Sequence, residues 1–141
     1  ARECFDLVEL MELPDVVFTG RVNVTEYLGG LDFTILTSIS EGQPLTILES
    51  YAAKLPAIAT DVGNCRGLLY GEDDDFGEAG ILTHIMNVKE IADAMVNLAR
   101  HPVCRKQMGE NGYRRVMAKY KISDMHQTYR KIYETFENID W

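Results

Sequence analysis

Two glutamates, Glu41 and Glu49, lie on either side of a point where a loop turns into a helix. A helix that opens after a strand presents unpaired backbone N–H groups, here those of Leu45 and Thr46, and these attract an anion such as phosphate. The two carboxylates would repel a phosphate, but they can accept hydrogen bonds from hydroxyl groups on either side of it. The pattern therefore indicates a ligand with anions in its middle and hydroxyls at both ends, such as a sugar–diphosphate–ribose.

The elements that position these residues are predicted to be a strand, a loop, a helix and a second strand. Phe33–Leu36 is a short run of β-prone apolar residues, as expected for a buried strand. Pro44 suits the first position of a helix, because its φ is already helical and its missing N–H is not needed there. The run Ala57–Thr60 predicts the next strand, closed by the turn Asp61–Gly63. Gly42, in the loop, lets a ligand approach the backbone closely.

The whole stretch SEGQPLTILESYAAKLPAIATDVGN resembles the nucleotide-sugar half of retaining GT-B glycosyltransferases of the family 4 type, which include bacterial sucrose and glycogen synthases. Those enzymes carry an E-x7-E motif, followed by a strand that ends in a T-D-x-G turn. Glu41 and Glu49 match the two glutamates, and Asp61 and Gly63 match the turn. The resemblance runs over residues 15–136, nearly the whole chain.

Within that group, the sequences EGQPL and VGNCRG look like those of the Pel-type exopolysaccharide glycosyltransferases. Gln43–Pro44 departs from the commoner EGFGL sequence of the wider group, where an aromatic–glycine pair lies near the donor sugar. Gly67 departs from the Pel-type pattern, because it stands where those enzymes usually have an acidic residue. The resemblance implies a role in exopolysaccharide biosynthesis, with UDP-glucose as the expected donor.

The resemblance also implies a role for each residue of the site. Glu41, the expected catalytic residue, would hold the donor hexose, and Glu49 would bind the ribose hydroxyls. The remaining donor-binding residues would contact the diphosphate (Gly42, Gln43, Pro44, Leu45 and Thr46) and the nucleotide base (Arg21, Val22 and Asn23). The implied mechanism uses no metal and no cofactor, and the leaving phosphate helps to deprotonate the acceptor.

Composition narrows the class of protein. The chain has 141 residues and a net charge of −8, which argues against broad nucleic-acid binding. No apolar run is long enough for a membrane span, and the N-terminal residues do not read as a secretory signal. Three widely separated cysteines fit reduced thiols in a cytoplasmic protein. The three histidines lack zinc-ligand spacing, and the acidic loop Gly71–Asp75 lacks the calcium-loop pattern.

The rest of the chain alternates strands and helices, which predicts an α/β, Rossmann-like fold with a mainly parallel sheet. Two further strands are expected, at Val16–Thr19 and Ala79–Thr83, which makes four in all. Helices are expected at Glu3–Leu13, Thr25–Leu28 (capped by Thr25), Cys65–Tyr70, from Asn87 to Arg100 (with Glu90 closing a capping box), Pro102–Tyr120, and after a Ser123 cap with an apolar side formed by Tyr129, Ile132, Tyr133 and Phe136.

By this resemblance, residues 1–141 form part of the C-terminal nucleotide-sugar-binding domain of a GT-B enzyme, truncated at its N-terminus. The family's two earlier strands, and the Arg–Lys pair that clamps the diphosphate, are not in the sequence. The saccharide acceptor would bind through the missing N-terminal domain, and the fragment alone should be inactive. A membrane polysaccharide-synthesis complex is a further implied partner.

Two alternatives stay open at the level of sequence. The first is a non-catalytic α/β module that senses a nucleotide or a protein partner. The second is a sugar-nucleotide epimerase of the same two-domain architecture, since its extra acid–base groups would come from the half that this sequence lacks. A basic Arg–Lys pair after an upstream strand would favour the transferase.

Overall fold

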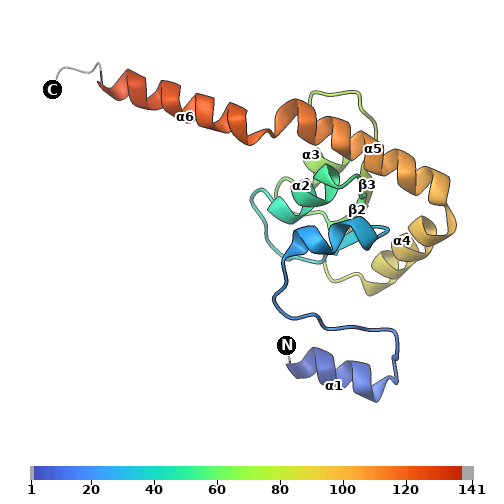
Figure 1. Ribbon diagram of the computed structural model, residues 1–141. Helices are drawn as coiled ribbons and strands as arrows, with labels where there is room; N and C mark the ends of the chain where they lie inside the picture. The colour runs from blue at the N-terminus through green and yellow to red at the C-terminus, as the bar shows by residue number, and fades with distance from the viewer. Residues whose placement is uncertain (1, 138–141) are drawn as a thin grey trace.

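The computed structural model describes residues 2–137, which form a small α/β body with one helix beyond it at each end (Figure 1). The elements in chain order are α1 (Arg2–Leu10), the 3-10 turns η1 (Val24–Glu26) and η2 (Leu28–Gly30), β1 (Thr34–Leu36), α2 (Leu45–Ala52), β2 (Ala57–Thr60), α3 (Cys65–Tyr70), β3 (Gly80–Thr83), α4 (Val88–Arg100), α5 (Pro102–Lys119) and α6 (Ile122–Glu137).

The three strands form one parallel sheet in the order β1-β2-β3, which confirms the predicted α/β class. Thr34 lies opposite Ala57, and Ala57 lies opposite Gly80, so all three strands begin at the same edge. Every residue of the central strand β2 is buried, as expected for a parallel strand covered on both faces.

The predicted strand Val16–Thr19 is wrong. These residues are exposed and belong to no strand. Their β-prone side chains match the pattern of a strand, but no other segment among residues 2–137 pairs with their backbone, and a strand needs such a partner. Phe18 instead contacts Phe5 of α1, with ring centroids 4.1 Å apart.

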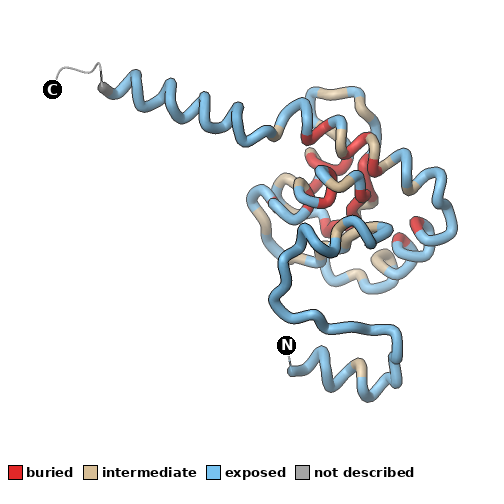
Figure 2. The backbone as a smooth tube through the Cα atoms, viewed as in Figure 1, coloured by how far each residue is buried: buried red, intermediate tan, exposed pale blue. Residues whose placement is uncertain are grey.

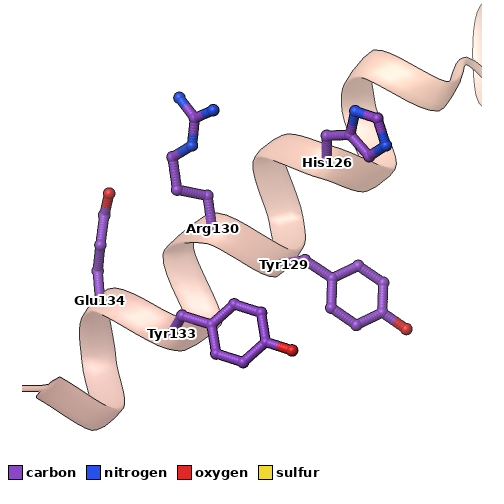
Figure 3. A pocket seen from close by; sticks show the side chains of 5 residues that line it. All are labelled: His126, Tyr129, Arg130, Tyr133 and Glu134. Atoms are coloured by element: carbon purple, nitrogen blue, oxygen red, sulfur yellow. The ribbon is translucent and has the colours of Figure 1, made fainter.

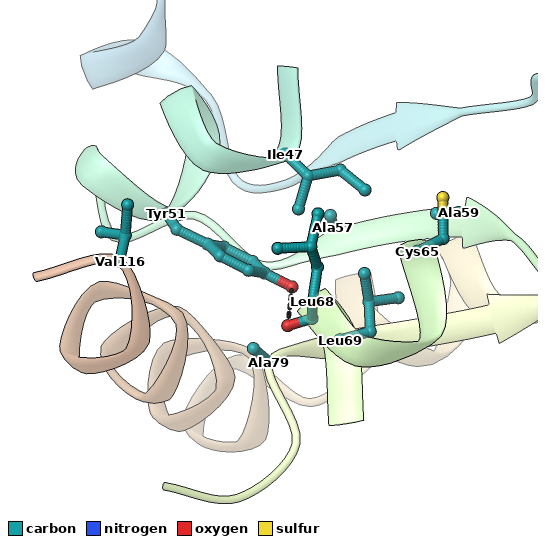
Figure 4. Packing of buried hydrophobic residues seen from close by; sticks show 9 residues of the cluster. All are labelled: Ile47, Tyr51, Ala57, Ala59, Cys65, Leu68, Leu69, Ala79 and Val116. Atoms are coloured by element: carbon teal, nitrogen blue, oxygen red, sulfur yellow. Dashed lines mark hydrogen bonds between the residues drawn. The ribbon is translucent and has the colours of Figure 1, made fainter. Parts of the chain in front are cut away.

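The core lies on both faces of β2. On one face Ala57 and Ala59 meet buried side chains from α2, α3 and α5, which are shown in Figure 4 (Ile47, Tyr51, Cys65, Leu68, Leu69 and Val116, with Ala79 before β3). On the other face Ile58 packs against Ala94 and Leu98 of α4. This division follows the alternation of side chains along a strand.

Helix α5 crosses close to α2 because two of its residues have no side chain. A Cβ atom added at Gly109 would lie 2.0 Å from the backbone oxygen of Lys54, and one added at Gly112 would lie 2.5 Å from the ring of Tyr51. Tyr51 is fully buried, and its hydroxyl donates a hydrogen bond of 3.2 Å to the Leu68 carbonyl. Burial raises the pKa of Tyr51 well above its usual value, although the charge of Arg115 opposes the shift.

A buried ion pair fixes the acidic loop between α3 and β3. Arg115, 1% exposed, donates to both carboxylate oxygens of Asp74 at 2.9 and 2.8 Å. Its remaining N–H groups donate to the carbonyls of Leu68, Leu69 and Gly77. The Arg115 hydrogen bonds hold the pKa of Asp74 well below its usual range, and Lys119 adds to this effect. Hydrogen bonds to other groups of the protein therefore hold this loop in place.

Helices α1 and α6 lie outside this body, and their residues are almost all exposed (Figures 1 and 2). Helix α6 projects from the end of α5, with Tyr129 54% and Tyr133 65% exposed. Both rings point to the same side of the helix (Figure 3). The predicted apolar side of α6 is thus present, but no other element of residues 2–137 covers it.

The structure corrects the predicted caps at Thr25 and Ser123 and confirms the cap at Asn87 without its capping box. Asn23, not Thr25, caps η1, because its side chain accepts hydrogen bonds from the N–H and hydroxyl of Thr25. Asn87 caps α4 as predicted, but Glu90 does not close the box, since its carboxylate binds the N–H and ring of His84 instead. Ser123 is the second residue of α6 rather than its cap, because the helix begins at Ile122.

Candidate functional site

The candidate site is at the edge of the sheet where the parallel strands end. Residues 37–44 follow β1, and residues 61–64 follow β2, so both loops leave from neighbouring carboxyl ends. In open α/β sheets, ligands bind in the crevice outside this edge. The sheet therefore brings together the two loops that the sequence singled out.

Short contacts lock the two loops to each other. The hydroxyl of Thr60 donates to the carbonyl of Ser38, and the N–H of Asn64 donates to the carbonyl of Gly42 at 3.0 Å. Gly63 has φ +51°, and a Cβ there would lie 1.9 Å from the Glu41 carbonyl oxygen. Only glycine permits this approach, so the turn after β2 sets the course of the loop that carries Glu41.

The N-terminus of α2 is open to solvent. The helix begins at Leu45, one residue later than predicted, because Pro44 has an extended ψ of 109° and acts as the N-cap. Pro44 is buried, whereas Leu45 and Thr46 are exposed. Among residues 2–137, no backbone acceptor pairs with the N–H groups of Leu45 and Thr46. A Cβ at Gly42 would meet nothing within 4 Å, which leaves room beside the backbone. An anion could bind here.

Glu41 is half-buried in the loop between β1 and α2, and its carboxylate accepts a hydrogen bond of 2.6 Å from the hydroxyl of Ser38.

Cys65, at the start of α3, has no exposed surface. Burial raises the pKa of the Cys65 thiol, and the charges of Glu41 and Asp61 raise it further. Cys65 is thus a packing residue and not a nucleophile, because reactive cysteines need a lowered pKa and access to solvent.

Glu49 is exposed on α2 and faces a different region from the loop of Glu41. It lines a pocket of about 330 Å³ whose opposite wall belongs to η1 and η2. The lining residues are Val24, Thr25, Leu28, Gly29, Glu49, Ala52 and Ala53. The predicted base-binding residues Arg21, Val22 and Asn23 directly precede this wall in sequence and are exposed. The side chain of Asn23 is already engaged in capping η1.

A larger cavity, of about 560 Å³, adjoins the start of α2. Gln43, Leu45 and Leu48 form one side of it. The other side comes from the junction of α5 and α6 (Lys119, Tyr120, Lys121, Ile122, Asp124, Met125, Thr128 and Tyr129). Sequence reasoning missed this second wall, because nothing in the spacing of two lysines and a tyrosine links them to a loop so distant in the chain.

A polar pocket of about 330 Å³ lies at the ends of β2 and β3. Asp61 of the turn lines it and forms an ion pair with Arg66. His84 and Glu90 form its far side and are bonded to each other at 2.9 Å. The polar side chains of this pocket are thus bonded to one another in pairs. Across residues 2–137, no cluster of three His, Cys, Asp or Glu side chains could hold a metal ion. No helix in that range is long and apolar enough to cross a membrane.

The family model described as "Glycosyl transferases group 1" matches residues 2–101. Among curated relatives, the N-acetyl-alpha-D-glucosaminyl L-malate synthase of Bacillus anthracis is 28% identical over 90% of this chain and 32% of its own length. The lipopolysaccharide core biosynthesis mannosyltransferase of Rhizobium meliloti is 26% identical over 85% of this chain and 34% of its own length. The chain thus spans about a third of the length of these relatives.

Two solved structures share the architecture. The sucrose-phosphate synthase of Thermosynechococcus elongatus superimposes with a TM-score of 0.81 at 25% identity, over 95% of this chain and 34% of that one. The C-terminal domain of a glycosyl transferase group 1 family protein from Francisella tularensis gives a TM-score of 0.70 at 28% identity, over 86% of this chain and 62% of that one. The chain therefore belongs to the group 1 glycosyl transferases and has the fold of their C-terminal domain.

Proposed function

We propose that the protein is a retaining glycosyltransferase that transfers a hexose from a nucleoside diphosphate sugar to a growing saccharide. The observation that supports this most directly is the open N-terminus of α2, whose N–H groups have no backbone acceptor and which follows a loop, after a parallel strand, that carries Glu41. A diphosphate is the ligand that such a helix start favours. Residues 1–141 would act as part of the enzyme's nucleotide-sugar-binding domain, and the acceptor would bind to another part of the enzyme.

In this proposal each group of the site binds one part of the donor. Backbone groups from Gly42 to Thr46 hold the diphosphate, Glu49 accepts hydrogen bonds from the ribose, and Arg21–Asn23 lie against the base. Glu41 orients the hexose and stabilises the positive charge that develops at its C1 atom as the bond to phosphate breaks. The leaving phosphate oxygen takes the proton of the acceptor hydroxyl, which forms the new bond on the same face, so no metal is needed.

The likeness of EGQPL and VGNCRG to Pel-type enzymes supports UDP-glucose as the donor and exopolysaccharide synthesis in the cytoplasm, at a membrane complex, as the process. Two relatives are named for teichuronic acid biosynthesis and for lipopolysaccharide core biosynthesis, which is in line with a cell-surface polysaccharide.

The test is calorimetric binding of UDP, GDP and ADP to the intact protein, followed by a transfer assay with the sugar donors of whichever nucleotide binds. We expect micromolar binding of one nucleotide, and transfer that persists in EDTA. Binding without transfer to any saccharide acceptor would favour a non-catalytic nucleotide-sensing module. Absence of binding to all three would contradict the proposal.

A further inference from the structure

The Gln43 side chain at the start of α2 is held by a partner from the neighbouring loop. The Asn64 amide donates a hydrogen bond of 2.8 Å from Nδ2 to Oε1 of Gln43. The backbone N–H of the same Asn64 donates to the carbonyl of Gly42 at 3.0 Å. Asn64 therefore fixes both the backbone before Gln43 and the Gln43 side chain. Neither the E-x7-E pattern nor the T-D-x-G turn includes Asn64.

The direction of this hydrogen bond follows from the surroundings of Asn64. Its Oδ1 lies over the first turn of α3, where a Cβ at Gly67 would be only 2.3 Å away. The first turn of a helix carries positive partial charge, which favours the amide oxygen over the NH2 group at that place, although the Asn64 side chain makes no cap hydrogen bond to α3. The absence of a side chain at Gly67 provides the necessary room.

This arrangement decides what Gln43 can offer to a ligand. Its Oε1 is already an acceptor for Asn64, and its Nε2 donates no hydrogen bond within residues 2–137. Gln43 lines the 560 Å³ cavity together with Leu45, whose N–H group belongs to the open helix start. The free donor of Gln43 thus stands beside backbone donors, and together they favour a ligand rich in acceptor oxygens.

We propose that Asn64 is a positioning residue that holds the Gln43 amide in one orientation, so that its NH2 group donates to an oxygen of the nucleotide-sugar donor. This rests on the proposed function, which it deepens. The acceptor atom is either a diphosphate oxygen or a hydroxyl oxygen of the hexose. UDP by itself contains the first, and only UDP-glucose contains the second. Without Asn64, the Gln43 amide is free to turn and to present its carbonyl oxygen, which repels a phosphate oxygen and cannot donate to a hydroxyl oxygen.

Asn64→Asp is the matched variant. It keeps the size of the side chain and the backbone hydrogen bond, and there is no side-chain cap hydrogen bond to α3 that the change could remove. However, a carboxylate can only accept, so the Gln43 amide turns its NH2 group to the new carboxylate and its oxygen to the ligand. We expect binding of UDP, of UDP-glucose or of both to weaken about tenfold, as for a lost hydrogen bond to a charged group.

The added charge of Asn64→Asp is controlled by repeating it with Gln43→Met, which has a similar length and no amide. If the effect passes through Gln43, Asn64→Asp should change affinity by less than about twofold in the Gln43→Met protein. An equal loss in both backgrounds would overturn the proposal, as would no loss in either. A loss with UDP identifies a phosphate oxygen, and a loss only with UDP-glucose identifies the hexose.

A second measurement tests the contact in the wild-type protein itself. The Gln43 side-chain NH2 signals, identified in an NMR spectrum by their absence from Gln43→Met, should shift when UDP or UDP-glucose is added to the wild-type protein. Signals that stay unchanged at saturation with both probes would overturn the proposal. Failure of the wild-type protein to bind any nucleotide is a different result, because it contradicts the proposed function itself.

Discussion

Glu49 is a solvent-exposed carboxylate on a helix, with a pocket beside it and no protein partner among residues 2–137 that neutralises it. If it accepts two ribose hydroxyls, shortening it to alanine removes both hydrogen bonds, each worth roughly 1.5–3 kcal/mol. We therefore predict that Glu49→Ala weakens UDP binding by about tenfold or more, measured by calorimetry on the intact protein. Glu78→Ala is the control, since Glu78 is exposed and precedes β3, at the opposite edge of the sheet. Unchanged affinity in Glu49→Ala would make Glu49 a solvated surface residue.

Glu41 differs because its carboxylate is half-buried and already bonded to Ser38. Replacing it with glutamine keeps the size of the side chain but removes the charge that would stabilise the reacting sugar. We predict that Glu41→Gln leaves UDP affinity within about twofold and lowers turnover by at least about a hundredfold, because the loss concerns the transition state. Glu49→Gln should instead weaken UDP and UDP-sugar alike. Equal losses of UDP affinity in both variants would contradict this assignment of roles.

At the scale of elements, the contact between α5 and α2 depends on Gly112. A methyl group there would press on the ring of the fully buried Tyr51. Overpacking of a core costs about 1–3 kcal/mol, whereas alanine gains about 1 kcal/mol over glycine in a helix. We predict that Gly112→Ala lowers the free energy of unfolding by up to about 2 kcal/mol, measured by urea denaturation. Lys106→Ala, at an exposed position of α5, should change it by less than about 0.5 kcal/mol. Greater stability in Gly112→Ala would show that α5 can move away at little cost.

Sequence patterns predicted most helices and the three paired strands, because their signals are local. The caps and breaks at Asn87 and Pro102, and the apolar runs before Asp61 and His84, depend only on neighbours in the chain. The strand at Val16–Thr19 failed because pairing is not local. A β-prone run becomes a strand only where another backbone lies beside it.

The candidate site also combines features that the local sequence predicts with features that it does not predict. The open start of α2 and the tight turn at Gly63 follow from proline and glycine within a short stretch. The lysines of the α5–α6 junction, and the hydrogen bond between Asn64 and Gln43, join segments distant in sequence. Such contacts depend on how helices pack on the sheet, which composition and spacing do not reveal. The roles of Glu41 and Glu49 remain predictions.

At the scale of the whole molecule, the buried pair of Arg115 and Asp74 couples folding to pH. The pKa of Asp74 is lowered in the folded protein, whereas an aspartate in an unfolded chain titrates at about 3.9. Below that pH the unfolded state binds more protons, so stability is present above it and is lost as pH falls toward the folded pKa. We predict that the free energy of unfolding of the wild-type protein drops between about pH 5 and pH 3.

The matched variant for this pH effect is Asp74→Asn, which cannot titrate. It should be less stable than the wild type at pH 7, since Arg115 loses its charged partner, but its stability should fall less steeply with acid. Urea denaturation at several pH values measures both curves. Parallel curves would mean that Asp74 contributes nothing to the acid sensitivity.

The exposure of α1 and α6 has a consequence for the exchange of backbone hydrogen with solvent deuterium. Opening either helix uncovers almost no buried surface, so it costs little free energy beyond its own hydrogen bonds. Amides of β2 are covered by the core and can exchange only when that core opens. In the chain of residues 1–141, mass spectrometry should find α1 and α6 deuterated within seconds to minutes and β2 protected far longer. Slow exchange in α6 would reveal that another surface, such as a second copy of the chain, covers its aromatic side.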